Sequence, residues 1–249
     1  MRTETEGIVL KQIKTSYGRR IVHLFTSDFG KISAGTSLGD KGRNRNTLAL
    51  QPFTLGKYRL FKNRDMYNID FAEVVRSHYS IGEDVDKYMR GAYVLEYTEK
   101  VLPEEIPAPG MFRLLLDFFD ALEKRNRGIG TLVLAYQTKV FAETGVFPSL
   151  DRCSSCGKDI SEEDTKAGIN FCTESGGVLC KQCVKEINSL IHCTKFDIIS
   201  ILKYFANNSL KNLENVALNE KTGLELEKII REYSEYHLNT SNIKSEKLI

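Results

Sequence analysis

The sequence Cys153-Ser154-Ser155-Cys156 is followed, after a hydrophilic insert, by a second CxxC pair, Cys180-Lys181-Gln182-Cys183. Each pair forms a tight turn that directs two sulfur atoms toward one point, and four thiolates in this arrangement are typical of a closed, tetrahedral zinc site. We therefore expect Cys153, Cys156, Cys180 and Cys183 to hold one structural Zn²⁺ in an insert that spans residues 151–185.

Other roles for these cysteines fit the sequence less well. A disulfide framework is typical of secreted chains, and we expect no secretory signal in the opening residues Met-Arg-Thr-Glu-Thr-Glu. A redox-active CxxC needs one pair at the start of a helix within a βαβ unit, a pattern that this sequence lacks. Cys172 and Cys193 are expected to be free thiols, and His192 is a weaker candidate ligand outside the paired motifs.

Helical periodicity flanks the cysteine segment on both sides. Apolar residues recur at helical spacing over residues 84–101, 111–124 and 131–143 before it, and over 195–207 and 221–238 after it. Gly145 and Pro148 are well placed to end the third of these helices. The pattern predicts a helical domain in two parts, residues 81–150 and 186–249, whose polar tail from Asn239 onward is expected to fray.

Residues 1–80 follow a strand pattern instead. Five short apolar or alternating stretches lie near residues 7–13, 20–26, 31–34, 53–61 and 66–75, and turn residues separate them. Gly30 is free to adopt the positive φ that one of these turns needs. The predicted class is therefore an α+β multidomain protein, with an N-terminal five-stranded OB-fold barrel followed by an all-α bundle that carries an inserted four-Cys zinc knuckle.

The net charge of +2 hides an uneven distribution. Residues 1–80 carry 14 Lys and Arg against 7 Asp and Glu, a net charge of +7, so the remainder of the chain is acidic. Such asymmetry favours a domain that binds nucleic acid or another polyanion, although a merely solvated basic face is the simpler alternative. No apolar run approaches the roughly 20 residues that span a bilayer, which predicts a soluble protein.

Basic and aromatic side chains of the barrel and its glycine-rich loop are the predicted DNA contacts. Lys and Arg bind phosphates with strong salt dependence and little sequence preference, and aromatic rings stack on bases in OB-folds. Aromatic residues of a small barrel lie more often in its core, so only two are selected for stacking. The predicted DNA-binding residues are Arg19, Arg20, Lys31, Lys41, Arg43, Arg45, Lys57, Arg59, Tyr17 and Tyr58.

No catalytic motif is present in the sequence. It contains no GxSxG, no GxxxxGK[ST], no HExxH and no GxGxxG after a strand. A zinc ion with four Cys ligands has no open position for an activated water. No carboxylate cluster suits Mg²⁺, which disfavours a metal-dependent nuclease. We therefore expect no catalytic residues and no enzymatic activity.

Short motifs follow one another in a specific order along nearly the whole chain. They are Gly7-Ile-Val-Leu10, Tyr17-Gly18, Phe25-Thr26, Gly30-Lys31-Ile32, Leu48-Ala49-Leu50-Gln51-Pro52-Phe53, Thr144-Gly145-Val146-Phe147-Pro148, the two CxxC pairs with Gly176-Gly177-Val178-Leu179, Tyr236-His237-Leu238 and Lys244-Ser245. Together with the order of barrel, bundle and cysteine insert, these motifs resemble the RecO family of bacterial recombination mediators. Arg19 and Arg20 depart from the family pattern, which usually has an acidic residue after Tyr-Gly.

The resemblance implies a DNA repair protein of the RecFOR pathway, located in the cytoplasm and associated with the nucleoid. Such proteins bind single- and double-stranded DNA without sequence preference and anneal complementary strands. They bind RecR and the acidic C-terminal tail of SSB, so that RecA loads onto SSB-coated DNA in recombinational repair. Lys139 lies where the family often has a basic residue on a bundle helix, and it is the expected contact for the SSB tail.

A second hypothesis remains open from the sequence. The chain would be a zinc-stabilised protein-interaction adaptor whose basic barrel binds an acidic partner, with DNA binding incidental. Partners that stay bound after nuclease treatment would favour this adaptor over the DNA-binding mediator.

Overall fold

The computed structural model describes residues 2–15, 20–36, 38, 45–63, 66–161, 168–194 and 196–248. The chain forms two compact units. The first comprises Met1–Lys124 together with Asn242–Ile249, and the second comprises Arg125–Ser241. The predicted change from barrel to helices near residue 80 therefore falls inside the first unit.

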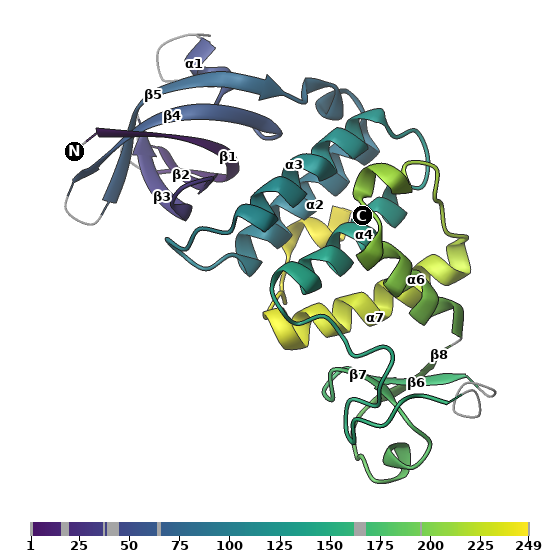
Figure 1. Ribbon diagram of the computed structural model, residues 1–249. Helices are drawn as coiled ribbons and strands as arrows, with labels where there is room; N and C mark the ends of the chain where they lie inside the picture. The colour runs from purple at the N-terminus through teal and green to yellow at the C-terminus, as the bar shows by residue number, and fades with distance from the viewer. Residues whose placement is uncertain are drawn as a thin grey trace. The chain divides into compact units, whose positions relative to one another are not determined.

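A five-stranded barrel opens the first unit (Figure 1). The strands pair in the order β1-β2-β3-β5-β4, and β4 pairs back to β1, which closes the barrel and gives the OB-fold topology. All neighbours are antiparallel except β3 and β5, which are parallel and pair only through Ala34–Tyr67 and Gly35–Asn68. The strands are β1 (Arg2–Lys14), β2 (Arg20–Thr26), β3 (Gly30–Thr36), β4 (Thr54–Asn63) and β5 (Met66–Ser77).

Alternation along the strands fills the barrel with apolar side chains. Val22, Leu24 and Ile32 are fully buried in one cluster with Tyr58 and Leu60. The short helix α1 (Arg45–Leu48) contacts β5, and the buried residues that follow it complete this core. Five strands and a closed barrel confirm the fold predicted for the N-terminal region.

Two long helices follow the barrel in the first unit. Asp84 caps α2 (Val85–Val101), because its carboxylate accepts a hydrogen bond from the Lys87 backbone N–H at 3.0 Å. Apolar residues on α3 (Pro109–Lys124) are buried along most of its length. The ring of Phe112 meets that of Phe25 edge-on, with centroids 5.2 Å apart, so α3 packs against the barrel.

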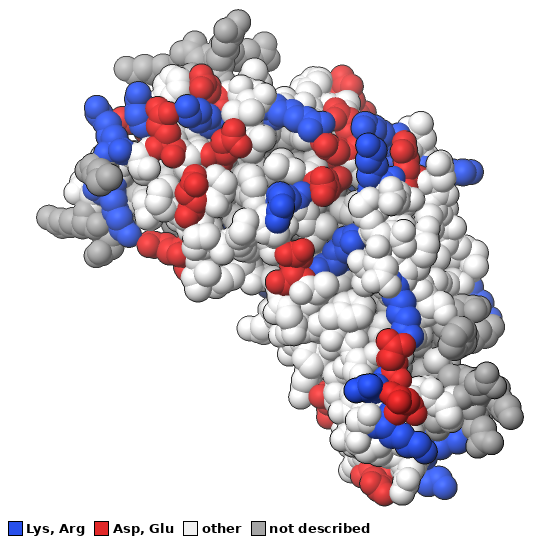
Figure 2. All heavy atoms as spheres, in the orientation of Figure 1, with Lys and Arg blue, Asp and Glu red and all other residues white. Residues whose placement is uncertain are grey.

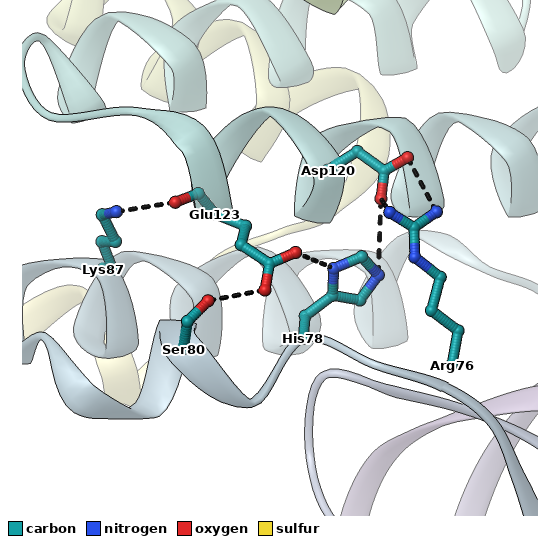
Figure 3. Close-up of polar contacts among 6 residues, drawn as sticks. All are labelled: Arg76, His78, Ser80, Lys87, Asp120 and Glu123. Atoms are coloured by element: carbon teal, nitrogen blue, oxygen red, sulfur yellow. Dashed lines mark hydrogen bonds and ion pairs between the residues drawn. The ribbon is translucent and has the colours of Figure 1, made fainter.

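A polar cluster also joins the barrel to α3 (Figure 3). His78, directly after β5, is fully buried, with Nδ1 3.0 Å from Glu123 Oε2 and Nε2 3.5 Å from Asp120 Oδ1. Asp120 also pairs with Arg76, and Glu123 accepts a hydrogen bond from the Ser80 hydroxyl at 2.6 Å. The two carboxylates lie about one turn apart on α3, so they hold the end of β5 at two points.

In the described part of the second unit, the α-helices are α4 (Ile129–Glu143), α6 (Phe196–Asn207) and α7 (Glu220–Leu238). Both α6 and α7 contact α4. Gly145, with φ of 75°, follows the end of α4, as the sequence predicts. The guanidinium of Arg125 is buried and donates to the carbonyls of Arg127 and Leu213 at 2.8 and 3.0 Å, which ties the start of this unit to the segment before α7.

The cysteine segment of the second unit contains a small sheet that the sequence did not predict. Its strands β6 (Ile169–Cys172), β7 (Gly177–Leu179) and β8 (Ile191–Thr194) pair antiparallel in the order β7-β6-β8. Two residues of α7 hold this sheet. His192 on β8 pairs with Glu232, and His237 Nε2 lies 2.8 Å from the Thr173 carbonyl oxygen.

The C-terminal segment belongs to the first unit. It ends in a 3₁₀ helix, Lys244–Leu248, and the Glu96 carboxylate on α2 accepts hydrogen bonds from the Lys244 and Ser245 backbone N–H groups, each at 2.9 Å. Ile243 and Ser245 are buried. The expectation that this tail frays is therefore wrong, because one carboxylate satisfies several donors at the start of its last helix.

None of the helices in the described part of the chain combines the length and the apolar character that crossing a membrane requires.

Candidate nucleic-acid interface and metal centre

A groove of about 1050 Å³ opens on the barrel where strand ends meet. The ends of β3 and β4 and the starts of β2 and β5 provide most of its lining. In an OB-fold, nucleic acids bind across this kind of surface, between the loops that join the strands. The described lining residues are Thr15, Arg20, Ile21, Gly35, Thr36, Leu38, Phe61, Asn63, Met66, Asn68, Ile69 and Asp70.

The groove combines polar and apolar groups. Arg20 is the cation among the described lining residues, and the amides of Asn63 and Asn68 offer both donors and acceptors. Phe61 is half-buried and Met66 is 49% exposed, so an apolar surface is accessible beside the amides. A surface of this kind suits unstacked bases with one or a few phosphates better than it suits a dense row of phosphates.

Three of the predicted phosphate contacts are engaged in ion pairs inside the first unit. Lys57 pairs with Glu4 at 2.7 Å, and Arg59 Nε lies 2.9 Å from Asp70 Oδ1. The pair lowers the pKa of Glu4 and raises the pKa of Lys57. Lys31 is buried; its Nζ lies 3.3 Å from Glu104 Oε1 and also donates to the Glu99 carbonyl at 2.7 Å.

Charges of both signs are interspersed over the barrel. Figure 2 shows Lys and Arg side chains together with Asp and Glu side chains on the face of the barrel in view, with several of the Lys and Arg side chains along its left edge. The described residues on this side therefore present both signs of charge.

Tyr58 does not lie on the surface, which corrects its selection for base stacking. Its side chain is fully buried in the barrel core, and its hydroxyl donates to the Ala49 carbonyl. Burial raises the pKa of Tyr58 well above its ordinary value. The alternation of β4 places the Tyr58 ring on the inner face of the strand. The aromatic residue of β4 that lines the groove is the half-buried Phe61.

The remaining predicted residues fall in different places. Arg20 lines the groove, and Arg45 is the first residue of α1. Lys139 on α4 donates from Nζ to the Ala206 carbonyl at 3.1 Å and is half-buried, and its contact with an SSB tail stays a prediction. Tyr17, Arg19, Lys41 and Arg43 lie outside the described residues.

Asn63, Met66 and Asn68 are candidate contacts that the sequence did not single out. They are neither basic nor aromatic, so a search by residue type passes over them. Their position offered a signal, because all three lie beside the predicted turn between the fourth and fifth strands, where OB-fold loops approach a ligand.

The four predicted ligands of the metal centre come together in the second unit. All four Sγ atoms of Cys153, Cys156, Cys180 and Cys183 lie within 4.8 Å of one another, and those of Cys156 and Cys180 are 3.9 Å apart. Zn–S bonds of about 2.3 Å in a tetrahedron place sulfurs about 3.8 Å apart, so the geometry fits a four-Cys zinc knuckle. No other group of His, Cys, Asp or Glu in the described part of the chain is placed to hold a metal ion.

Hydrogen bonds prepare one of these sulfurs for a metal. Burial by itself raises the pKa of Cys153, but backbone hydrogen bonds from Cys180, Cys156 and Ser155 outweigh it and bring this pKa down to about 6. A thiolate is the form that binds a metal, so the folded segment favours the ligating form of Cys153. A hydrogen bond with Ser155 alone would lower the pKa of Cys183, but hydrogen bonds with neighbouring cysteines and burial outweigh it and raise this pKa instead, so without a metal the negative charge is shared unevenly among the four sulfurs.

The other cysteines and His192 are not part of the cluster of ligands. Cys172 is buried in the apolar cluster beside the ligands, and Cys193 is exposed on β8. Neither forms a disulfide bond, which agrees with the expectation from the sequence. His192 faces Glu232, so its ring is engaged by α7.

Two family models match the chain one after the other. A model described as "Recombination protein O N terminal" matches residues 1–78, and one described as "Recombination protein O C terminal" matches residues 82–247. The first match covers the barrel, and the second covers the helices and the cysteine segment.

Curated relatives are similar over almost their whole length, and each bears the name "DNA repair protein RecO". The relative from Caldanaerobacter subterraneus subsp. tengcongensis is 28% identical over 94% of this chain and 92% of its own. The relative from Alkaliphilus metalliredigens is 26% identical over 98% of this chain and 97% of its own. One from Listeria monocytogenes serovar 1/2a is 27% identical over 92% of this chain and 86% of its own.

Proposed function

Because the chain belongs to the RecO family of DNA repair proteins, we propose that it is a non-enzymatic mediator that binds single-stranded DNA and anneals complementary strands. The groove of the closed barrel is the observation that carries this proposal. It lies where OB-folds bind oligonucleotides, and it presents a cation, amides and an apolar surface together.

The groove residues suggest how a strand is held. Arg20 neutralises a phosphate, and Phe61 and Met66 provide an apolar surface against which a base packs. Asn63 and Asn68 hydrogen-bond base edges or sugars, and an amide that both donates and accepts tolerates different bases. Binding of this kind leaves the sequence largely unread, as an annealing protein requires.

Salt-titrated binding of two unrelated single-stranded oligonucleotides tests the proposal. We expect both to bind with affinities that fall steeply with salt. Arg20→Glu should weaken both and reduce the salt slope by about 0.7, the value expected for one phosphate on a single strand. Lys211→Glu, an equal charge change on an exposed residue of the second unit, is the matched control. Binding that ignores salt, or that is confined to one sequence, would contradict the proposal.

The family membership also motivates the partners. We propose that the protein binds RecR and the acidic C-terminal tail of SSB, and that it helps RecA to load onto SSB-coated DNA, acting in the cytoplasm close to the nucleoid. Lys139 is the proposed contact for the SSB tail. An annealing and RecA-loading assay with full-length SSB, repeated with SSB that lacks its tail, tests this step, because the tail deletion should remove the stimulation.

Zn²⁺ is the proposed metal of the four-Cys centre. A closed set of four thiolates is the ligand set of structural zinc, and the bound ion would cross-link the turn at Cys153–Cys156 to the segment at Cys180–Cys183. Purified protein should contain close to one zinc per chain. Cys180→Ser should lose the metal and unfold the second unit, whereas Cys193→Ser should keep the metal and the folded second unit. A metal-free protein of unchanged stability would rule the zinc out.

A further inference from the structure

The turn between α2 and α3 pairs with the barrel. Glu104 forms a parallel β-bridge with Lys31 on β3, and the Glu105 N–H donates to the Lys31 carbonyl at 2.8 Å. The turn reaches the barrel beside β3 in Figure 1. In the described residues, β3 pairs with β5 through Ala34 and Gly35, which leaves the start of the β3 edge without a strand partner. The turn occupies this part of the edge at Lys31. We call residues 103–107 the strap.

Both carboxylates of the strap bind cations of the barrel. Lys31 Nζ lies 3.3 Å from Glu104 Oε1, and Lys62 Nζ lies 3.2 Å from Glu105 Oε2. Lys62 is also placed over the Tyr67 ring, 4.7 Å from its centroid. The hydrogen bond with Glu105 is the main cause that raises the pKa of Lys62. The strap therefore covers two positive charges of the basic domain with two negative ones.

The close contact between the strap and the start of β3 requires a glycine at position 30. Gly30 has φ of 67°, and a Cβ at this position would lie 2.0 Å from the Ile106 carbonyl oxygen. Only glycine lets the strap approach the start of β3 this closely. Glu105 itself adopts φ of 54°, a conformation that non-glycine residues rarely take without surrounding support.

The strap is held weakly enough to exchange. Glu104 and Glu105 are 58% and 50% exposed, and Lys62 is 43% exposed, whereas the Lys31 side chain is only 10% exposed. The Lys62–Glu105 pair is exposed on both sides, so it contributes little to stability and is screened by salt. The exposed Glu104 carboxylate can leave Lys31, whose Nζ keeps its hydrogen bond to the Glu99 carbonyl. Ile106 is 55% exposed, so little apolar surface holds the strap down. A phosphate of a polyanion that contacts Lys31 or Lys62 would take the place of the strap carboxylate, so an ion pair is exchanged and none is lost.

We propose that the strap is an autoinhibitory contact, in which Glu104 and Glu105 compete with the phosphates of a nucleic acid for Lys31 and Lys62. The inference rests on the proposed DNA binding of the barrel and adds its regulation. In the strapped form these two cations are neutralised, and the groove stays open to a strand. Displacement of the strap adds two phosphate contacts, so binding becomes tighter and more sensitive to salt.

Neutralising the strap is the first experiment. Glu104→Gln with Glu105→Gln keeps the side-chain size and the Glu105 backbone hydrogen bond but removes both charges. The matched control is Glu83→Gln with Asp86→Asn, which removes two exposed charges on the same unit and breaks the Asp86–Arg90 ion pair. We expect the strap variant to bind a single-stranded oligonucleotide roughly three- to tenfold more tightly than the control variant, with a salt slope steeper by about 1.4.

Lys62→Ala separates competition from a general charge effect. In the unmodified protein this change should alter affinity less than about twofold, because Glu105 already neutralises Lys62. In the strap variant the same change should remove about half of the gain in salt slope. If Lys62→Ala has the same effect in both backgrounds, or if the strap variant binds like its control, the strap does not compete.

Hydrogen exchange gives a readout on the unmodified protein. The Glu105 amide, which donates to Lys31, should exchange faster when the oligonucleotide is added, whereas the Leu102 amide, which donates to Thr98 at the end of α2, should not. Unchanged or greater protection at Glu105 would overturn the inference. Absence of salt-sensitive binding in every variant would instead reject the proposed function, so the two failures are distinguishable.

Discussion

Tyr58 has a structural role that can be measured apart from DNA binding. Its hydroxyl satisfies the Ala49 carbonyl inside the barrel core. Tyr58→Phe leaves this carbonyl without its donor and should lower the free energy of unfolding by about 1–3 kcal/mol. Urea denaturation measures the loss, and Tyr79→Phe, whose ring is 73% exposed, should stay within about 0.5 kcal/mol. If Tyr58→Phe weakened oligonucleotide binding without any loss of stability, its assignment to the core would be contradicted.

Glu123 should make stability depend on pH. Partial burial alone would raise its pKa, but hydrogen bonds from Ser80 and His78 and the charges of His78 and Arg76 outweigh burial and lower the pKa. A carboxyl whose folded pKa is lowered stabilises the fold above its unfolded pKa, and this contribution is lost as pH falls through the folded pKa.

Glu123→Gln should therefore flatten the acid limb of the stability curve. Melting temperatures between about pH 6 and pH 3 should fall less steeply for this variant than for the unmodified protein, with the largest difference at the upper end of that range. Glu83→Gln, an exposed carboxyl outside the cluster, provides the comparison. Parallel curves for Glu123→Gln and the unmodified protein would show that the cluster does not contribute.

At the residue scale, the sequence predicted well which cysteines come together, because residue type and spacing decide this, and it predicted less well the surroundings of the cations, because ion pairing decides those. The cluster of four cysteines follows from the two CxxC motifs, since paired motifs of this spacing bring four thiols to one point. The cations were chosen by charge alone. Their pairing with Glu4, Asp70 or Glu104 depends on strand register and on a distant turn, neither of which residue type reveals.

At the scale of the elements, a substitution at Gly30 tests the contact between the strap and β3. Gly30→Ala would force a Cβ into the Ile106 carbonyl oxygen at a positive φ, and we expect a loss of about 1–3 kcal/mol in stability. The Glu105 amide should also exchange faster, because the strap must move away. Gly82→Ala is the control, since a Cβ there meets no atom within 4 Å. Equal stability of the two variants would argue against a close contact between Gly30 and the Ile106 carbonyl.

Most of the long elements were predicted closely, although β1 begins at Arg2 and not near residue 7. The alternation over residues 20–26 and the helical spacing over 84–101 both match the structure within one residue, at β2 and α2. The three strands of the cysteine segment were missed because each spans only three or four residues, too short to show a period. One contact that holds them, between His192 on β8 and Glu232 on α7, joins residues 40 positions apart in the sequence.

For the whole molecule, the attachment of the C-terminal segment is the contact to test. Partial burial alone would raise the pKa of Glu96. Hydrogen bonds from Ser245 and Lys244 outweigh this effect, so the pKa lies below its ordinary value. Glu96→Ala should speed hydrogen exchange at the Lys244 and Ser245 amides and cost about 1–2 kcal/mol, since these bonds reach a charged but partly exposed group. Glu227→Ala, on the exposed face of α7, should leave these amides unchanged. Unaltered exchange in Glu96→Ala would show that the tail is held by other contacts.

The docking of the tail on α2 has a mechanical consequence. The first strand and the last 3₁₀ helix both belong to the first unit, so the entire second unit is spliced into the chain between Lys124 and Asn242. Tension applied to the two ends of the chain would load the first unit alone, through β1 and the bonds at Glu96. The second unit, with its cluster of four cysteines, would carry no force until the tail detached.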